Sequence, residues 1–334
     1  MSKQTILVTG GAGYIGSHTV HLMVQKGFDV VVVDNLVYGH EDAIIDKGVA
    51  FYIGNLADSE LLNRIFSKHK IAAVLHFAAY ALVGESVVEP NKYYQNNLAA
   101  PLVLLDAMRK HGCDTFIFSS TCATYGNPQY MPMDEKHPQV PINPYGTSKL
   151  MLEMVLKDYG KAYDLKYVIL RYFNASGCSS NGLIGEDHTP ESHLIPLVLK
   201  AIKGERSAIT VFGTDYDTPD GTCVRDYIHI EDLAEAHALA FEYLKAGGAS
   251  DVFNLGTGKG YSVKEVIDIA EKVSGKKVPV LFGERRAGDP PFLVANAAKA
   301  NSVLGWIPKY NDLKETIRTA WAWESGPKNG RFTA

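Results

Sequence analysis

The sequence predicts an α/β fold with a doubly wound parallel sheet and a smaller mixed α/β lobe. Two observations carry this prediction. In the first half, short and almost continuously apolar runs alternate with longer segments whose apolar residues recur every three or four positions, and this alternation stops after Arg171. Apolar strands separated by helices are typical of a parallel sheet that helices cover on both faces.

Six strands are expected in the first half, because six short runs are rich in β-branched or aromatic residues. They are Ile6–Val8, Asp29–Val33, Ala50–Ile53, Ala73–Leu75, Thr115–Phe118 and Tyr167–Leu170. Between the strands, the three- and four-residue apolar spacing predicts helices. These are Gly16–Lys26, Ser59–Lys68, Asn91–Lys110 and Tyr145–Tyr163.

A polar stretch at residues 174–196, rich in Gly, Ser, Asn and Pro, marks the expected domain boundary. We expect a first domain at residues 1–173 and a mainly separate lobe at 174–334, with segments such as 225–255 returning to the first domain. The lobe mixes short strands with helices. The strands are Ile209–Phe212, Val252–Leu255 and Val278–Leu281, and the helices are His193–Lys203, Asp232–Leu244, Val263–Val273 and Leu313–Trp323.

The composition excludes several classes of protein. The chain has 334 residues, of which 46% are hydrophobic and 21% charged, and its formal net charge is −4. Such a chain folds, and its slightly acidic balance gives no electrostatic reason to bind nucleic acid or an anionic membrane. No stretch reaches the roughly 18 apolar residues of a membrane span, and no signal-peptide pattern precedes the first strand, so a cytoplasmic location is expected.

No metal site is expected from the spacing of histidines and cysteines. His18 and His21 lie three apart on one helix, and His188 and His193 share a loop, but no third ligand follows either pair at a usable spacing. The four cysteines form no CxxC pair, which argues against both a zinc site and a disulfide framework.

A glycine-rich turn follows the first expected strand. The run TGGAGYIG at residues 9–16 places Gly10, Gly13 and Gly16 between a strand and a helix. In that arrangement bare backbone N–H groups and the positive end of the helix dipole face a pyrophosphate. The strand–turn–helix context is the one that the dinucleotide fingerprint requires, so the turn predicts a Rossmann-type domain.

The end of the second expected strand indicates which dinucleotide binds. That strand ends in Val33-Asp34-Asn35. An acidic residue at this position accepts hydrogen bonds from a ribose 2′-hydroxyl and repels a 2′-phosphate. The sequence therefore favours NAD over NADP.

A tyrosine and a lysine stand four residues apart at the start of one expected helix. Tyr145 and Lys149 consequently project from the same helix face. A phenol with a pKa near 10 is a poor base at neutral pH, but a cation about 4 Å away lowers that pKa by at most about three units at an effective dielectric of 20. We expect Lys149, together with a positively charged nicotinamide, to lower the pKa of Tyr145.

A series of motifs then extends along nearly the whole chain. They are TGGAGYIGSH at 9–18, VGESV at 83–87, FIFSST at 116–121, YGTSKLMLE at 145–153, RYFNASG at 171–177, GEDHTPESHLIP at 185–196, FGTDYDTPDGTCVRDYIHIEDLA at 212–234, NLGTGKGYSV at 254–263 and RRAGDPP at 285–291. In this order they resemble the extended short-chain dehydrogenase/reductase family, and within it the NAD-dependent nucleotide-sugar 4-epimerases.

The resemblance implies an isomerase of galactose metabolism that interconverts UDP-galactose and UDP-glucose. Hydride would pass from the sugar C4 to tightly bound NAD, leaving a 4-keto intermediate, and would return to the opposite face. Tyr145 would be the base, Thr121 would bridge the sugar oxygen and Tyr145, and Lys149 would bind the nicotinamide ribose. The family also implies a homodimer that pairs through the helices at 91–110 and 145–163.

Further site residues follow from the resemblance where the motifs match. The cofactor site would comprise Gly10, Gly13, Tyr14, Ile15, Gly16, Asp34, Asn35, Asn55, Leu56, Phe77, Ala78, Ala79, Asn96, Thr121, Tyr145, Lys149, Tyr172 and Phe173. The UDP-sugar site would comprise Thr121, Tyr145, Asn174, His193, Leu194, Phe212, Arg225, Arg286, Asp289 and Leu293. The two arginines suit a diphosphate, which a planar guanidinium binds through two hydrogen bonds.

Three positions depart from the family pattern. Ala81 replaces a lysine that often lies near the pyrophosphate, and Asn55 replaces an aspartate that contacts adenine. The Asn55 oxygen can still accept a hydrogen bond from the adenine amine. Leu293 stands where the family has a large or a small residue that sets tolerance for N-acetylated sugars, and its intermediate size leaves that tolerance open.

Several other functions compete with this interpretation. Dehydratases and decarboxylases on this scaffold carry acidic residues just after the Ser/Thr position, where this chain has Cys122 and Ala123. A UDP-pentose or UDP-N-acetylhexosamine 4-epimerase would use the same chemistry in a different sugar pocket. A non-catalytic NAD-sensing protein is the alternative from another class, but such proteins lose the Tyr/Lys pair that is present here.

Overall fold

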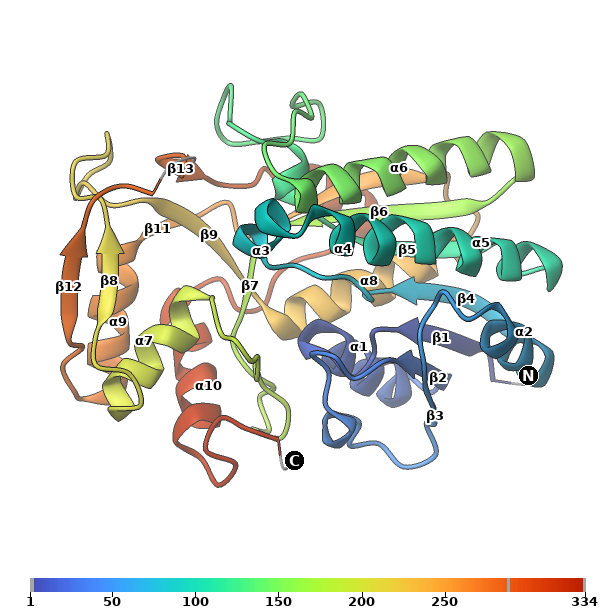
Figure 1. Cartoon of the computed structure of the whole chain (residues 1–334), viewed down its shortest axis with the longest axis horizontal. Helices are drawn as coiled ribbons and strands as arrows, with labels where there is room; N and C mark the ends of the chain where they lie inside the picture. Colours follow the sequence, from blue (N-terminus) through green and yellow to red (C-terminus); the bar gives the residue numbers. More distant parts are fainter. Residues whose placement is uncertain (1–2, 287–288, 333–334) are drawn as a thin grey trace.

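A seven-stranded parallel sheet organises the first two-thirds of the molecule (Figure 1). This computed structural model describes residues 3–286 and 289–332, so positions 287 and 288 of the RRAGDPP motif lie outside the described residues. The sheet has the order β10-β6-β5-β4-β1-β2-β3. Its strands are β1 (Thr5–Thr9), β2 (Asp29–Asp34), β3 (Ala50–Ile53), β4 (Ile71–His76), β5 (Thr115–Thr121), β6 (Lys166–Tyr172) and β10 (Asp251–Leu255).

The strand order reverses at the centre of this sheet. The chain passes outward from β1 to β2 and β3, and then crosses back to place β4 on the other side of β1. Every described pairing in the sheet is parallel. The predicted doubly wound sheet is therefore confirmed, and its switch point, where such sheets bind ligands, lies between β1 and β4.

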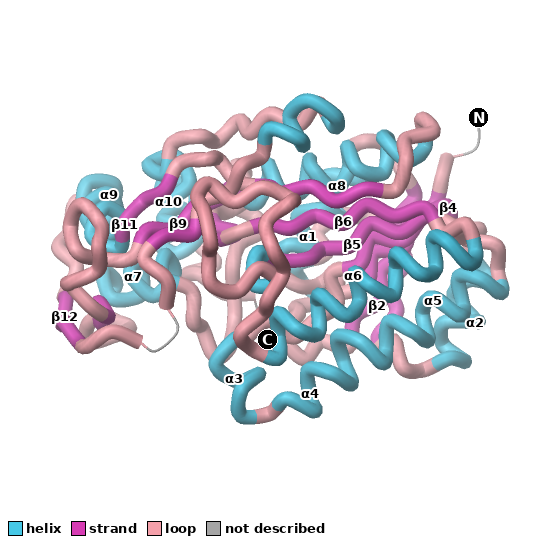
Figure 2. The backbone as a smooth tube through the Cα atoms, turned by 90° about the horizontal axis from the view of Figure 1, so that it is seen from above, coloured by secondary structure: helices cyan, strands magenta, loops and turns pink. Residues whose placement is uncertain are grey.

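Helices cover both faces of the sheet, because successive strand residues point to opposite sides. One face, which includes Ile6 and Val32, packs against α1 (Tyr14–Gln25) and α8 (Ile230–Lys245). The opposite face, which includes Leu7, packs against three helices. These are α2 (Ser59–Lys68), α5 (Ala100–Lys110) and α6 (Pro144–Tyr163), of which α5 and α6 run side by side (Figure 2).

The helix predicted at 91–110 is divided in the structure. It consists of α4 (Pro90–Tyr94), a π-helical turn at Gln95–Ala99 and α5, and α3 (Val83–Val88) precedes it without having been predicted. Pro101 has no backbone N–H, so the regular bond to residue 97 cannot form at this point. The π-helical turn carries Asn96, one of the predicted cofactor residues.

Smaller sheets and three helices form the remaining lobe. β9 (Val224–His229) pairs with β7 (Asn174–Ser176), β11 (Gly260–Ser262) and β13 (Phe292–Leu293), while β8 (Ile209–Phe212) pairs with β12 (Val280–Gly283). The helices α7 (Leu194–Lys203), α9 (Val263–Ser274) and α10 (Leu313–Ser325) pack around one core. The short turns are η1 (Glu41–Ala43), η3 (Cys122–Thr124) and η4 (Ala300–Leu304).

Most predicted elements of the lobe are present, with two differences. The strand predicted at 278–281 begins two residues later, at Val280. Pro279 has no N–H to donate to the strand pairing, although its carbonyl accepts a hydrogen bond from the Ile209 N–H. β7, β9, β11 and β13 were not predicted. β7 lies in a polar stretch, and β11 and β13 have only three and two residues. Among the described residues no helix combines the length and apolar character needed to cross a bilayer.

A buried ion pair joins α6 to the sheet. Glu153 and Arg171 are 0% and 3% exposed at their side chains, and a guanidinium nitrogen lies 2.5 Å from a carboxylate oxygen. Ser120 of β5 donates to the same carboxylate at 2.6 Å, and Arg171 donates to the hydroxyl of Tyr125 at 3.0 Å. Tyr125 in turn donates to Asn254 of β10 at 2.6 Å, so one network connects β5, β6, β10 and α6.

Replacing Glu153 by glutamine leaves the Arg171 charge buried without its partner. We expect Glu153→Gln to lower the free energy of unfolding by about 3–5 kcal/mol, the usual cost of an unpaired buried charge. Asp158→Asn, the same change at an exposed position of α6, should change it by less than about 0.5 kcal/mol. Urea unfolding followed by circular dichroism measures both, and equal effects of the two substitutions would contradict the assigned role.

Candidate functional site

The turn between β1 and α1 brings backbone into direct contact with backbone. Gly10 has a φ of 70°, in the left-handed region, and a Cβ there would lie 2.5 Å from the Ala78 nitrogen. A Cβ on Gly16 would overlap the carbonyl oxygen of Gly10. Glycine is therefore required at both positions to hold β1, α1 and the end of β4 together.

The same turn exposes the amino end of α1. Gly13 is the N-cap of α1, and the first turn of the helix contains no acidic side chain. A Cβ on Gly13 would have a single close neighbour, the Gly10 carbonyl at 3.4 Å, so this side of the turn is open. Free N–H groups at a helix N-terminus attract an anion, which makes this end a site for a phosphate group.

A cavity lies in front of this turn, at the carboxyl ends of β1, β2 and β4. The structure brings many of the predicted cofactor residues to its wall. They are Gly10, Gly13, Asp34, Asn35, Asn55, Leu56, Phe77, Ala78, Ala79 and Asn96. The wall also contains six residues that were not predicted to bind the cofactor, namely Val33, Val37, Tyr38, Gly39, Gly54 and Tyr80. Val33 belongs to β2, and no periodic pattern marks the loops that carry the other five.

Asp34 anchors the glycine turn to β2. One carboxylate oxygen accepts the Ala12 N–H at 3.0 Å, and the other accepts the Leu36 N–H at 2.8 Å. Burial raises the pKa of Asp34, while these hydrogen bonds from backbone N–H groups lower it. Because each carboxylate oxygen has further acceptor capacity, Asp34 can still receive ribose hydroxyls.

Two departures from the family pattern, Asn55 and Ala81, concern the side chains around this cavity. The Asn55 side-chain oxygen accepts the Ala57 N–H at 2.8 Å and retains a second lone pair. Lys92 lies beside the same cavity, with its ammonium 4.5 Å from the ring centre of Tyr80 and 3.2 Å from the Tyr38 hydroxyl. Lys92 also pairs with Glu85 at 2.7 Å, so its charge is partly neutralised there.

Eight predicted cofactor residues do not line the cavity: Tyr14, Ile15 and Gly16 at the turn, and Thr121, Tyr145, Lys149, Tyr172 and Phe173. Tyr14 is buried and crosses to the lobe, where its hydroxyl donates to the Gly177 carbonyl at 2.6 Å. Ile15 packs against the core beneath α1, and Gly16 provides the close approach to Gly10. In the structure Tyr14, Ile15 and Gly16 position the turn.

The predicted catalytic residues come together at the end of β5. Thr121 is the last residue of β5, and Tyr145 and Lys149 lie on the first turns of α6. All three are buried, at 6%, 8% and 4% exposure. Thr121 hydrogen-bonds to Tyr145, and the Lys149 ammonium donates to the Ser119 carbonyl at 2.9 Å.

Burial dominates the electrostatics of this group. It raises the pKa of Tyr145 by desolvation, and the interaction with Thr121 opposes this only in part. Burial lowers the pKa of Lys149 to about 7, against the attraction of Glu153. The expected lowering of the Tyr145 pKa by Lys149 together with a positively charged nicotinamide stays a prediction, since these values describe the protein without NAD.

The backbone of Tyr145 is held from the side of the π-helical turn. Ser148 donates to the Tyr145 carbonyl at 2.7 Å, and Asn97 donates to the Ser148 hydroxyl at 3.2 Å. The Asn97 oxygen also accepts the Tyr80 N–H at 2.8 Å. This chain of bonds connects the tyrosine to the wall of the first cavity.

Tyr172 and Phe173 follow β6 into the space beside this group. The Tyr172 and Ser119 hydroxyls lie 2.9 Å apart. Phe173 packs in a small core with Tyr125, Met133 and Ala295, and Leu293 borders the same core.

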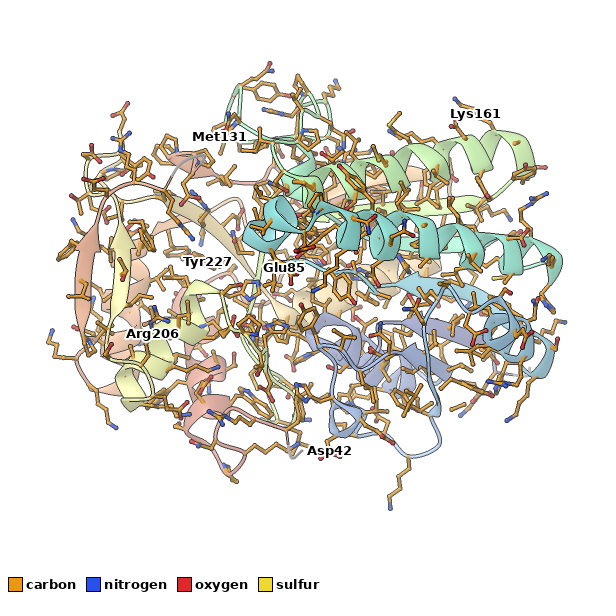
Figure 3. All side chains as sticks on the ribbon, in the orientation of Figure 1. Asp42, Glu85, Met131, Lys161, Arg206 and Tyr227 are labelled. Atoms are coloured by element: carbon orange, nitrogen blue, oxygen red, sulfur yellow. The ribbon has the colours of Figure 1, made fainter. Side chains whose placement is uncertain are left out.

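A second cavity opens in the lobe. It brings together most of the predicted UDP-sugar residues, and Arg206 and Tyr227, labelled in Figure 3, also line it. The predicted residues on its wall are Asn174, His193, Leu194, Phe212, Arg225, Arg286 and Asp289. Leu293 is absent from the described wall of this cavity.

The charges of the second cavity suit an anionic ligand. Asp289 lies 3.6 Å from the Arg225 guanidinium and 3.2 Å from that of Arg286, so the two arginines share one counter-ion. Arg286 also lies 4.9 Å from the ring centre of Phe212. Two cations held by one carboxylate retain a net positive charge, which favours a diphosphate.

Comparison with known proteins identifies the family. Residues 6–256 match the model of the NAD dependent epimerase/dehydratase family. This chain belongs to that family. The matched range begins in β1 and ends just after β10, so it covers the whole seven-stranded sheet of this epimerase/dehydratase family member.

Individual family members are similar over almost their full length. The UDP-glucose 4-epimerase of Halalkalibacterium halodurans is 51% identical over 328 residues, covering 98% of each chain. A crystal structure of UDP-glucose 4-epimerase from Brucella ovis in complex with NAD superposes with a TM-score of 0.93 at 49% identity, over 95% of this chain and 97% of that one. The Bifidobacterium longum enzyme, in complex with NAD+ and UDP, has a TM-score of 0.93 at 42% identity, over 98% and 100% of the chains.

The close approach at Gly16 gives a direct test of the cofactor turn. We expect Gly16→Ala to reduce the NAD that remains with the purified protein at least tenfold, because its Cβ has no space beside the Gly10 carbonyl. Gly84→Ala is the matched control, since a Cβ there meets nothing within 4 Å. Acid release and enzymatic assay of NAD per chain measures the effect. Normal NAD content in folded Gly16→Ala protein would contradict the geometry.

Proposed function

We propose that this chain is a UDP-glucose 4-epimerase that interconverts UDP-glucose and UDP-galactose with NAD as its cofactor. The observation that carries the proposal is the convergence of Thr121, Tyr145 and Lys149 at the end of β5. Hydrogen bonds through Ser148 and Asn97 connect Tyr145 to Tyr80 on the wall of the first cavity, and Arg225 of the second cavity acts electrostatically on Cys122, the neighbour of Thr121. The names of the full-length relatives support the same activity.

The residues of the first cavity fit a dinucleotide. The glycine turn offers backbone N–H groups for the pyrophosphate, and its close approach requires glycine at Gly10 and Gly16. Asp34 offers acceptors for the ribose hydroxyls. When bound, NAD accepts a hydride from the sugar C4, returns it later, and carries a positive charge while oxidised. Since the cofactor is regenerated in each cycle, it can remain bound throughout.

Tyr145 exchanges the proton of the reaction. Oxidation at C4 removes a hydride and the proton of the 4-hydroxyl, and Tyr145 takes that proton while Thr121 bridges the two oxygens. Reduction of the opposite face of the 4-keto sugar reverses the transfer, so Tyr145 returns the proton. One residue thus serves as base and acid in turn.

The charge of Lys149 controls how readily Tyr145 ionises. In the protein without NAD, the pKa of Lys149 is about 7. Near neutral pH its ammonium group is therefore only partly protonated. A phenolate at Tyr145 would stabilise the protonated lysine, because opposite charges favour one another in a buried site. The two residues therefore titrate as a linked pair, with Glu153 one helical turn beyond Lys149 favouring the cation.

The residues after Thr121 argue against loss of water or of a carboxyl group. Cys122 and Ala123 stand where such enzymes carry acids. Burial raises the pKa of the Cys122 thiol to about 12, so it remains protonated and cannot act as a base at neutral pH. Reversal at C4 is the reaction that these side chains serve.

The second cavity holds the UDP-sugar in this proposal. Arg225 and Arg286 grip the diphosphate, and Asn174, Leu194 and Phe212 line the same cavity. The Bifidobacterium longum relative was solved with UDP, which supports a uridine nucleotide. Residues 1–173 then bind mainly NAD and residues 174–334 mainly the sugar nucleotide, with β10 and α8 returning to the first sheet.

We also propose a homodimer that pairs through α5 and α6. These helices lie side by side (Figure 2). Several large apolar side chains on them are exposed. They are Leu102, Met151, Met154 and Tyr163. Apolar side chains grouped on adjacent helices are typical of a protein interface.

The activity is tested with purified protein to which no NAD has been added. We expect UDP-galactose to be converted to a mixture with UDP-glucose, as followed by proton NMR, because NAD stays bound. No UDP-glucose, even with NAD supplied, would overturn the proposal. Parallel reactions with UDP-N-acetylglucosamine and a UDP-pentose show which sugars the site around Leu293 accepts.

Removing the phenol of Tyr145 should abolish most of this activity. We expect Tyr145→Phe to lower kcat by about 10² to 10⁴, the usual contribution of general acid–base catalysis. Tyr159→Phe removes a hydroxyl from the same helix and should retain full activity. Activity of Tyr145→Phe within a few-fold of the wild type would show that another group moves the proton.

Charges placed on α6 should separate the dimer. We expect the wild type to have twice the chain mass of 36.5 kDa in multi-angle light scattering, and a Met151→Glu/Met154→Glu double variant to be monomeric. Ile307→Glu, at a residue that is 75% exposed outside these helices, should remain dimeric. A dimeric double variant would move the interface to another face.

A further inference from the structure

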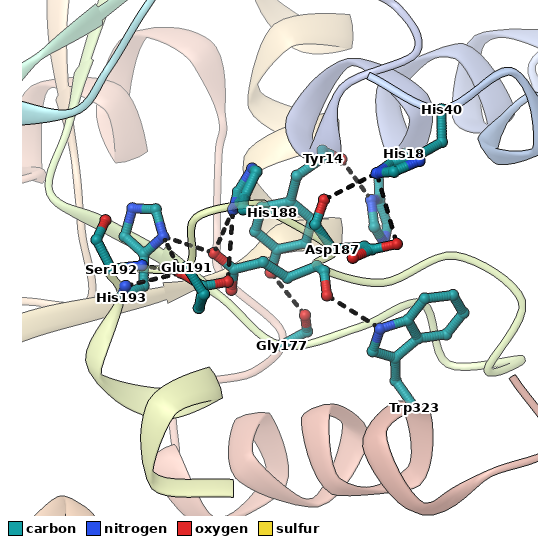
Figure 4. Close-up of polar contacts among 11 residues, drawn as sticks. Tyr14, His18, His40, Gly177, Asp187, His188, Glu191, Ser192, His193 and Trp323 are labelled. Carbon is teal, nitrogen blue, oxygen red and sulfur yellow. Dashed lines mark hydrogen bonds and ion pairs between the residues drawn. The ribbon is translucent and has the colours of Figure 1, made fainter. Parts of the chain in front are cut away.

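Two histidines and two glutamates of one connector converge on a single point. The connector joins β7 to α7, and the four side chains are Glu186, His188, Glu191 and His193, here called the His–Glu quartet. Figure 4 labels His188, Glu191 and His193 of this quartet. One ligand atom from each residue lies within 4.8 Å of the others. Sequence spacing alone found only the two histidines, because the carboxylates enter from turns of irregular backbone.

The distances within the quartet are those of a small coordination polyhedron. The His193 Nδ1 lies 2.8 Å from Glu186 Oε1 and 3.0 Å from Glu191 Oε1, and the His188 Nδ1 lies 3.3 Å and 3.6 Å from oxygens of the same two carboxylates. Ligands about 2.0–2.1 Å from a tetrahedral zinc ion are about 3.3 Å apart. One donor atom from each residue lies within 4.8 Å of the others, so the side chains would move together by up to about 1.5 Å to hold one ion.

Hydrogen bonds do not satisfy the quartet. The Glu186 and Glu191 side chains are 7% and 4% exposed. Glu186 Oε1, His188 Nδ1 and Glu191 Oε2 are buried and have no hydrogen-bond partner of normal geometry in the part of the chain that the structure describes. Glu186 Oε1 points into the quartet, where both imidazoles contact it at ion-pair distance. Buried polar atoms without hydrogen bonds require another partner.

The quartet also needs positive charge. Two buried carboxylates repel each other unless positive charge lies between them. Protons can supply that charge, but a single N–H points along one line, whereas each Nδ1 here faces two carboxylates. One divalent cation would balance both carboxylates and contact all four donor atoms, with both imidazoles neutral.

We propose that the His–Glu quartet binds one divalent transition-metal ion, and that zinc is the ion it fits best. Two imidazole nitrogens with two carboxylate oxygens are ligands that zinc accepts in tetrahedral sites, whereas magnesium and calcium favour sets made only of oxygen. Four protein ligands leave no open position on a tetrahedral ion. The site is therefore structural rather than catalytic.

The surroundings of the quartet indicate what the ion stabilises. The ring of His188 meets the ring of Tyr14 edge-on at 6.1 Å, and Tyr14 opens α1 directly after the cofactor turn. His193 caps α7 on the wall of the second cavity, and Trp323 of α10 donates to the Glu186 carbonyl at 3.1 Å. An ion at the quartet would therefore hold together residues 186–193 of the connector, which contacts Tyr14 at the start of α1 and leads into α7 on the wall of the second cavity.

Hydrogen bonds from backbone N–H groups hold the Glu191 carboxylate in place. The Ser192 and His193 N–H groups donate to Glu191 Oε1 at 2.7 and 2.8 Å. Such bonds orient a metal ligand before the ion arrives, and they are usual around metal sites. The other oxygen, Glu191 Oε2, faces His188.

Cobalt(II) provides the decisive probe, because it replaces zinc and its four-coordinate complexes absorb visible light strongly. NAD-loaded protein is treated with a chelator, desalted and titrated with Co²⁺ alone. We expect one equivalent to produce an intense visible band, and one equivalent of Zn²⁺ to remove it. Metal analysis of protein loaded with Zn²⁺ and then desalted should give about one ion per chain.

Three variants show where the ion binds. His188→Asn and Glu191→Gln should lose the cobalt band and retain less than a tenth of the zinc. His21→Asn, which removes a histidine paired with Asp46 outside the quartet, should behave as the wild type. Circular dichroism and NAD content verify that each variant folds.

The wild type alone can overturn the proposal, even where a variant does not fold. No visible band and less than 0.1 zinc per chain would show that protons neutralise the quartet. A weak band typical of six-coordinate cobalt, or a band that His21→Asn abolishes, would also contradict it. None of these results depends on epimerase activity, so the metal site and the proposed function fail independently.

Discussion

The buried ion pair between Glu153 and Arg171 is the constraint on which the catalytic end of the sheet depends. The Glu153 carboxylate also accepts a hydrogen bond from Ser120, the neighbour of Thr121. Glu153 lies one helical turn from Lys149. Burying two charges is costly unless their hydrogen bonds are complete, and here Ser120, Tyr125 and Gln139 complete them. The same network therefore connects α6 to β5. Desolvation lowers the pKa of Lys149, and the attraction of Glu153 opposes this shift.

The site is divided between two cavities that chemistry requires to be adjacent. The first forms at the switch point of the sheet, where strand ends and a helix N-terminus face the same space. The second is made by the lobe and supplies the arginines that an anionic nucleotide needs in a chain of net negative charge. In the proposed function the attraction for the two anionic ligands is therefore local: backbone N–H groups would bind one ligand and guanidinium groups would bind the other.

Local patterns in the sequence predicted the residues whose roles depend on nearby backbone. The glycine turn, Asp34 and the Tyr145/Lys149 pair follow from strand–turn–helix order and helical spacing, and the structure places them where those rules expect. Residues that meet through irregular loops were harder to predict. Tyr38 and Tyr80 reach the first cavity, and Glu186 and Glu191 meet His188 and His193, only because the tertiary fold brings turns together. The raised pKa of Tyr145 also reflects burial, which sequence spacing does not measure.

The position of β10 has a consequence for how the chain is made. The strand at one edge of the main sheet comes from residues 251–255, after most of the lobe has been passed. During synthesis β6 therefore has an unpaired edge until about 80 further residues have emerged, and unpaired edges attract other chains. The division of the chain into a cofactor part and a sugar part describes binding but not folding. A nascent fragment ending at residue 173 would lack the strand and the helix that close its sheet.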